Sequence, residues 1–222
     1  MLVTGAFLLG TLAARDVEAQ ERVTFHIKVG EAFTNLRGPD PRVFATPFGG
    51  GGENPDALEF DGQWNVTGGV AIEIPVTGMF SIQPEVLYSR RSSNVKLAQE
   101  TITLDPDAQL RIRAEYLEIP ILAKFYTGHS PNIRLYFYGG LTFAFRLSAE
   151  SETQFLGAVE TDDIKDQLKS TDLGYILGFG LDLGAHLSAE FRQHYGTKDI
   201  IAVEFDEKIT WGAAIFTLGV RF

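Results

Sequence analysis

Eight stretches of this 222-residue chain alternate between apolar residues and polar or small residues. A period of two puts successive side chains on opposite faces of a β-strand, so each stretch predicts a strand with one apolar face. The pattern therefore predicts an all-β fold and argues against a helix bundle. The expected strands are residues 22–33, 62–75, 79–90, 110–126, 133–147, 171–183, 187–195 and 209–222.

The links between these stretches alternate in length. Long links cover residues 34–61, 91–109, 148–170 and 196–208, and short links cover 75–78, 127–132 and 184–186. Alternating long outer loops and short periplasmic turns are typical of transmembrane β-barrels, whose strands need about 9–11 residues each. We therefore expect an eight-stranded antiparallel up-and-down transmembrane β-barrel in the bacterial outer membrane. Alternation by itself would also fit a soluble ligand-binding barrel or a sandwich with its apolar face inside.

Charged residues lie on the second face of the strands, whereas we count none at mid-strand positions of the apolar face. In a membrane barrel the charged face lines the lumen, which eight strands leave only wide enough for side chains. Buried charges must be paired, so the sequence predicts a network of salt bridges that fills the lumen and leaves no diffusion pore. A proton or small-solute path is the alternative. The predicted network consists of Lys28, Glu73, Glu85, Glu118, Lys124, Arg134, Arg146, Asp172, Asp182, Glu190, Arg192 and Arg221.

Four residues break the strand pattern. Ile209 and Trp211 fall on the wrong parity of the last strand, which predicts a bulge there or a strand end above the membrane. Pro84 and Pro120 lie at similar heights on neighbouring strands, and neither can donate a ladder hydrogen bond. We expect a bulge or a missing rung at the prolines, with a lateral weak point in the wall as the alternative.

The amino terminus has the features of a targeting segment. Residues 2–14 are apolar, and Val17–Ala19 form a small-x-small cleavage pattern before Gln20. This predicts a cleaved signal peptide at residues 1–19 and a barrel domain at 20–222, although a short N-terminal helix of the mature protein is the alternative. The net charge of −10 argues against a nucleic-acid partner, and the absence of cysteine excludes disulfides and thiolate sites.

Residues 115–126 read EYLEIPILAKFY, a segment that resembles the Tyr-Leu-Glu-Ile-Pro stretch of PorT-like outer-membrane β-barrels, the "porin family". Size and strand number also resemble OmpA/OmpX-type eight-stranded barrels. The carboxyl end, AIFTLGVRF, looks like the signal read by the barrel-assembly machinery, and its residues are Phe216, Leu218, Val220 and Phe222. The resemblance implies contact with that machinery, with outer-membrane lipid and with lipopolysaccharide. The family name does not itself imply a pore.

These features favour a structural or interaction role in the cell envelope, with no enzymatic activity and no cofactor. One alternative is a subunit of a larger envelope or secretion assembly, whose first and third long loops bind another protein. A second is a lipid-modifying enzyme with His194 at the outer rim and Asp199 and Ser188 as partners, although no G-x-S-x-G elbow is present. Acidic loop residues offer oxygen ligands without EF-hand spacing, so no metal site is expected; they are Asp105, Asp107, Glu160, Asp162, Asp163 and Asp166.

Overall fold

The computed structural model describes residues 22–37, 60–95, 109–127, 132–201 and 209–222. The predicted signal peptide at 1–19 lies outside the described residues, as do Asp105 and Asp107. Within the described ranges, no helix is long and apolar enough to cross a membrane.

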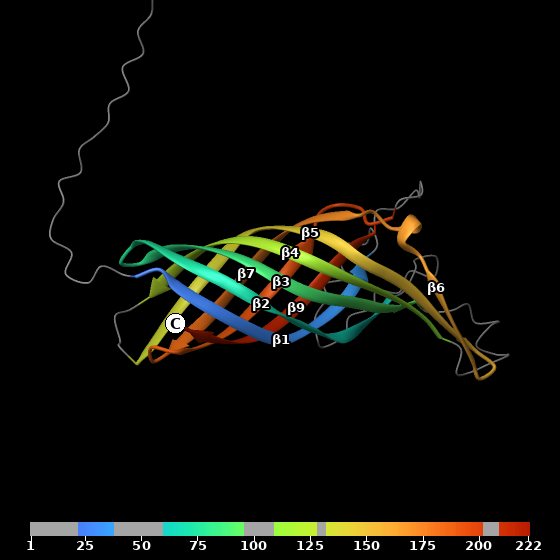
Figure 1. Cartoon of the computed structure of the whole chain (residues 1–222), viewed down its shortest axis with the longest axis horizontal. Coiled ribbons are helices and arrows are strands. Elements are labelled where there is room, and N and C mark those ends of the chain that lie inside the picture. The colour runs from blue at the N-terminus through green and yellow to red at the C-terminus, as the bar shows by residue number, and fades with distance from the viewer. Residues whose placement is uncertain (1–21, 38–59, 96–108, 128–131, 202–208) are drawn as a thin grey trace, which may run out of the picture.

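Eight antiparallel strands close into a barrel, as the alternation predicts (Figure 1). Each barrel strand pairs with its neighbours around the wall; β1 pairs with β9, and β4 pairs with β5 to complete the circle. The ninth strand, β6, pairs only with β5 among the described residues. The elements are β1 (Thr24–Arg37), β2 (Phe60–Thr77), β3 (Phe80–Val95), β4 (Gln109–Thr127), β5 (Ile133–Phe155), β6 (Ala158–Asp163), the 3₁₀ turn η1 (Lys165–Gln167), β7 (Thr171–Leu183), β8 (Leu187–Gly196) and β9 (Thr210–Arg221).

The apolar face of the strands points outward. In β7, Leu173, Leu177 and Phe179 are exposed, whereas Asp172 and Asp182 are buried. The same inversion holds around the wall, where Val, Ile, Leu and Phe side chains are exposed and charged side chains are enclosed. A soluble sandwich or ligand-binding barrel would bury the apolar face instead, so this distribution suits a wall surrounded by lipid.

Several strands continue beyond their predicted outer ends. β1 reaches Arg37, β3 reaches Val95 and β5 reaches Phe155, so part of each long link is strand. The outer ends of β4, β5 and β6 form a ribbon whose β5–β6 end projects beyond the barrel in Figure 1. This ribbon is continuous with the wall, because β3 pairs with β4 as far as Val95 opposite Leu110. These extensions carry polar residues on both faces, so the apolar alternation that predicts the rest of each strand does not extend to them.

One interruption of the hydrogen-bond ladder falls at the prolines, and none falls at Trp211. Pairing of β3 with β4 stops at Pro84 opposite Ile121 and resumes three residues later at Leu87 opposite Glu118, so two rungs are missing, which confirms the predicted interruption. Of the two explanations offered for Ile209 and Trp211, the bulge is wrong, because β9 keeps a continuous register with both β1 and β8. A strand end agrees with the structure at Ile209, since β9 begins at Thr210. Trp211 is buried inside the barrel, where its parity places it.

A mid-strand position on the outward face of β1 carries a charge. Glu31 in β1 has the outward parity of Val29 and is exposed on the wall. The expectation that mid-strand outward positions carry no charge is therefore wrong at this position. The cause lies in the strand length: β1 continues six residues past Glu31 to Arg37, so Glu31 stands in the middle of the strand rather than near its end.

Close strand approach at Gly140 gives a first testable prediction. A Cβ there would stand 2.0 Å from the backbone oxygen of Ile121 on the neighbouring strand β4. Because backbone rather than a flexible side chain must yield, we expect Gly140→Ala to lower the free energy of unfolding by roughly 1–3 kcal/mol. Urea titration in detergent measures this, with Gly78→Ala as control, since no atom lies within 4 Å of a Cβ at Gly78. Equal stability of the two variants would contradict the packing described.

Candidate functional site: the filled lumen and its outer cover

The barrel interior holds its charges in three clusters stacked along the axis. The lower cluster, near the short turns, is centred on the Glu73 carboxylate of β2. Lys124 Nζ lies 3.0 Å from Glu73 Oε2, and Tyr126 and Ser81 donate hydrogen bonds to Oε1 at 2.5 and 2.9 Å. His26 Nε2 lies 3.3 Å from Oε2. One carboxylate thus ties β1, β2, β3 and β4 together.

The middle cluster is a closed quartet of two cations and two carboxylates. Lys28 Nζ lies 2.7 Å from Glu85 and 2.8 Å from Glu190. Arg192 reaches the same two carboxylates from the other side, at 2.7 and 2.6 Å. Each charge therefore meets two of opposite sign, and Tyr136 Oη donates a further bond to Glu190 at 2.9 Å. All four charged side chains are buried, so their mutual pairing supplies the interactions lost with water.

The upper cluster is centred on Arg91, which belongs to the predicted long link 91–109. Arg91 of β3 is buried and forms ion pairs of 2.8 Å with Glu118 and 2.7 Å with Asp172. Its guanidinium also lies 4.5 Å from the ring centroid of Tyr116. The parity of Glu85, Leu87, Ser89 and Arg91 would have placed Arg91 in the lumen had the strand been extended by one residue.

The structure places nine of the twelve predicted network residues in the buried interior and three at half-buried positions. Asp182 is buried and pairs with Arg221 at 2.8 Å. Arg134 stacks 4.0 Å from the ring centroid of Tyr126, and Arg146 stands opposite Tyr116 in the β4–β5 ladder. The predicted assembly residues Phe216, Leu218, Val220 and Phe222 are all exposed on the outer wall.

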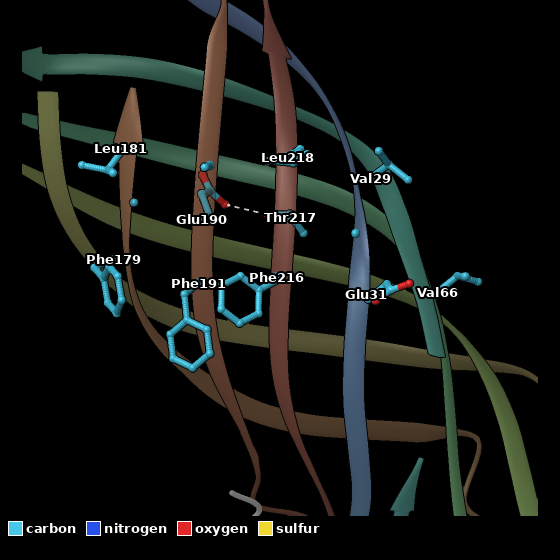
Figure 2. Close-up of a pocket in the computed structure, with 13 residues that line it drawn as sticks. Val29, Glu31, Val66, Phe179, Leu181, Glu190, Phe191, Phe216, Thr217 and Leu218 are labelled. Atoms are coloured by element: carbon cyan, nitrogen blue, oxygen red, sulfur yellow. Dashed lines mark hydrogen bonds between the residues drawn. The ribbon is translucent and has the colours of Figure 1, made fainter. Parts of the chain in front are cut away.

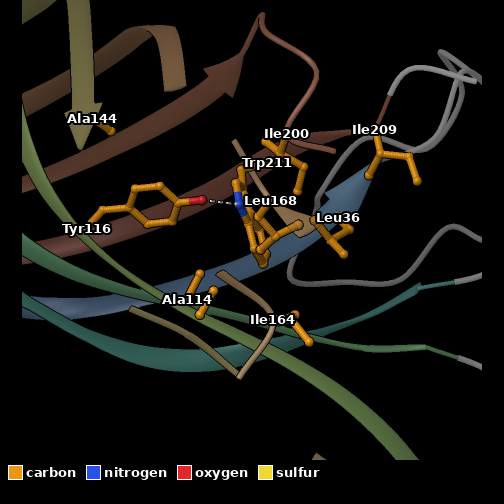
Figure 3. Packing of buried hydrophobic residues seen from close by; sticks show 10 residues of the cluster. Leu36, Ala114, Tyr116, Ala144, Ile164, Leu168, Ile200, Ile209 and Trp211 are labelled. Carbon is orange, nitrogen blue, oxygen red and sulfur yellow. Dashed lines mark hydrogen bonds between the residues drawn. The ribbon is translucent and has the colours of Figure 1, made fainter. Parts of the chain in front are cut away.

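An apolar cluster covers the upper charges toward the long loops (Figure 3). Trp211 and Tyr116 contribute from the wall, and the Trp211 indole N–H donates to Tyr116 Oη at 3.0 Å. Ile164 and Leu168 come from the segment after β6, and Ile200 comes from the segment after β8. The cluster thus joins the wall to two of the long links and places apolar side chains above the charged interior.

Asp199 fixes the segment after β8 to its neighbours. Its carboxylate accepts hydrogen bonds from the backbone N–H groups of Ile209 and Ile201 and lies 3.1 Å from Lys169 Nζ. Burial by itself would raise the pKa of Asp199, but these donors and the nearby Lys169 ammonium hold it below its ordinary value. The Lys169 backbone N–H also donates to Ile200 at 2.7 Å. The cover is therefore held by directed bonds as well as by apolar contact.

The residues of the enzyme alternative do not come together. His194 is buried inside the barrel rather than placed at the rim, close beside Gly174. Ser188 stands near the opposite end of β8, paired with Asp182 and Gly219, and Asp199 is engaged by Lys169. The Ser–His–Asp arrangement that the enzyme alternative requires is therefore not formed. Within the described ranges, no three His, Asp or Glu side chains group as a metal site would require.

Comparison with known proteins agrees with this architecture. A family described as "Outer membrane protein beta-barrel domain" matches residues 18–202. No curated protein matches the chain. Among solved structures, Ail of Yersinia pestis in complex with the heparin analogue sucrose octasulfate has a TM-score of 0.45 at 10% identity, covering 90% of this chain and 99% of that one.

Two further solved structures have similar values. OprG of Pseudomonas aeruginosa has a TM-score of 0.45 at 13% identity, covering 90% of this chain and 95% of its own. Neisserial surface protein A has a TM-score of 0.44 at 11% identity, covering 89% and 97%. The family match extends over most of the chain and includes seven of the eight barrel strands. The chain therefore belongs to the outer membrane protein β-barrel domain family and is a protein of the bacterial outer membrane.

Proposed function

We propose that this chain is a non-conducting barrel that anchors an interaction surface to the outer membrane. The observation that carries this proposal is the interlocked quartet of Lys28, Glu85, Glu190 and Arg192 across the middle of the lumen. Passage of a solute would require these buried, doubly paired charges to separate in a low-dielectric interior, which costs several kcal/mol for each charge. Because side chains fill the lumen, we place the function of the protein on its outer surfaces.

The ribbon of β4, β5 and β6 is the surface best suited to a protein partner. All six residues of β6 are exposed, and the strand pairs on one side only among the described residues. An unpaired strand edge offers backbone hydrogen bonds to an extended segment of another chain. Phe155 and Ala158 close the ribbon with a two-residue turn, and the neighbouring Leu156 and Val159 are exposed apolar side chains. Acidic residues Glu160, Asp162 and Asp163 then favour a partner with basic side chains.

This role suits either a free-standing envelope protein or a barrel subunit of a larger assembly. The PorT-like stretch at residues 115–126 supports the second form by resemblance. Contact with lipopolysaccharide and with the assembly machinery through Phe216, Leu218, Val220 and Phe222 is part of the same proposal, supported by the exposure of these side chains.

Site-specific photo-crosslinking in cells tests the interaction role. A photo-reactive residue at Val159 on the ribbon should give a discrete protein adduct, because this exposed position adjoins the unpaired edge. The same residue at Leu177, which faces lipid on β7, is the matched control and should give none. Replacing residues 152–161 by Asn-Gly should abolish the adduct of a crosslinker at Asp162 while the barrel still folds, since β4, β5 and β7 pair without β6. No adduct at Val159, or equal adducts at both positions, would contradict the proposal.

A further inference from the structure

The outer wall carries a row of phenylalanines that ends at a carboxylate. Phe80, Phe125, Phe137, Phe179, Phe191 and Phe216 are consecutive register partners across six neighbouring strands, and the next partner is Glu31. Neighbouring rings touch within this row: the centroids of Phe179 and Phe191 are 5.5 Å apart, and those of Phe191 and Phe216 are 4.9 Å apart. Figure 2 shows the upper part of the row, from Phe179 to Glu31 and Val66.

A hollow of about 600 Å³ lies on the wall along the upper part of this row. One border is formed by Phe179, Phe191, Phe216 and Glu31. The other is the neighbouring row of register partners, Leu181, Ala189, Leu218 and Val29. The small side chain of Ala189 leaves a depression between larger neighbours. The volume lies within the range of small-molecule sites, roughly 300–1,000 Å³.

Glu31 lies at a depth where a carboxylate requires a partner. Six steps of about 4.8 Å between strands tilted by roughly 40° raise the row by about 18 Å from Phe80, which begins β3 at a short turn. The apolar band of such barrels is about 25 Å tall, so Glu31 falls inside its outer third. Glu31 forms no hydrogen bond or ion pair with another described residue, whereas Glu115, also on the outer wall, is paired with Arg90 at 2.9 Å.

We propose that this hollow is a lipid-binding site. An acyl chain packs along the phenylalanine row over Ala189, and Glu31 accepts hydrogen bonds from an amide N–H or hydroxyl at the junction of that chain with its headgroup. We favour lipid as the occupant because the lining side chains that face the bilayer are apolar apart from Glu31. The other two polar lining residues, Glu190 and Thr217, are buried and hydrogen-bonded to each other inside the barrel. The depth of Glu31 favours donors near the acyl chain over a headgroup ammonium, which resides in the polar layer. The specificity is therefore for acylamide or hydroxyacyl lipids.

Two lipids with the same phosphocholine headgroup test this specificity. N-palmitoyl sphingomyelin carries an amide N–H and a hydroxyl beside its chains, and dipalmitoyl phosphatidylcholine carries neither. Native mass spectrometry of the folded protein in detergent should show tighter retention of sphingomyelin by about ten-fold, the value of a hydrogen bond to a charged group. Brominated chains supply a second measurement: they should quench Trp64, which is exposed beside Phe33, and not the buried Trp211.

Three variants separate the contribution of the Glu31 carboxylate from that of the apolar hollow. Glu31→Leu should bind both lipids equally, because the acceptor is gone and the apolar hollow remains. Ala189→Phe should lose both lipids, because it fills the hollow. Glu115→Leu is the matched control for a wall carboxylate and should keep the preference. The inference is overturned if the wild-type protein shows no preference, if Glu31→Leu keeps it, or if dipalmitoyl phosphatidylethanolamine outcompetes sphingomyelin through its ammonium. A second copy of the chain bound over Glu31 in place of lipid would overturn it as well.

Discussion

Substitution of Lys28 by Met is expected to lower the free energy of unfolding by about 3–5 kcal/mol. Lys28 is 2% exposed and bridges Glu85 and Glu190, so its loss leaves two buried carboxylates sharing Arg192. The cost arises mainly from the charge left without a partner rather than from the lost contacts themselves. Urea unfolding in detergent micelles, followed by the mobility difference between boiled and unboiled samples, measures the change.

A double substitution distinguishes charge imbalance from lost packing. Lys28→Met combined with Glu190→Gln removes one charge of each sign and should recover most of the stability, although each side chain is altered. Lys198→Met is the control, because Lys198 is an exposed residue whose hydrogen bond is to Thr171 at the surface, and its effect should stay below about 0.5 kcal/mol. If the double variant is less stable than Lys28→Met, the quartet is not governed by charge balance.

Trp211→Ala should cost a similar amount at the other end of the lumen, about 3–5 kcal/mol. Trp211 is 0% exposed, packs among residues from the wall and two long links, and donates to Tyr116. Removing the indole leaves a cavity beneath Ile200 and Leu168 and deprives the buried Tyr116 hydroxyl of its donor. Denaturant titration measures the loss of stability.

The chain contains two tryptophans, and the other provides the control. Trp64 is 58% exposed on the outer wall, where it touches Phe33. Trp64→Ala should therefore cost about 1 kcal/mol or less in detergent. Each variant also retains a single tryptophan, so fluorescence reports the cover in one case and the wall in the other. Equal losses for the two variants would contradict the buried position of Trp211.

The barrel architecture could be predicted from the sequence because apolar residues recur at every second position wherever a strand contacts lipid. The eight predicted stretches all correspond to barrel strands, and the prolines interrupt the ladder where expected. Prediction failed where no lipid imposes the pattern. The outer extensions of β1, β3 and β5 and the strand β6 depend on backbone pairing and on contacts between distant links.

In the barrel interior, too, the local sequence pattern predicts some features, whereas others depend on contacts between distant residues. Parity indicates which charged side chains point inward, but it does not identify their partners. Lys28 pairs with both Glu85 and Glu190, which lie 57 and 162 residues away in the sequence. Partner choice depends on the stagger of strands around the barrel, which local pattern does not contain. Arg91 lies one residue beyond the predicted strand 79–90, and Glu31 lies near the outer end of the predicted strand 22–33, whereas both are well inside the observed strands. The predicted strand of His194 ends only one residue before β8 does, so its buried position depends on side chains from other strands and from the long links rather than on the length of β8.

Conductance across a planar lipid bilayer tests the central claim most directly. The folded protein, identified by its mobility shift on boiling, should insert without producing steady current steps, because the paired charges fill the lumen and the apolar cluster covers it. Reproducible steps from the wild-type protein would contradict the account.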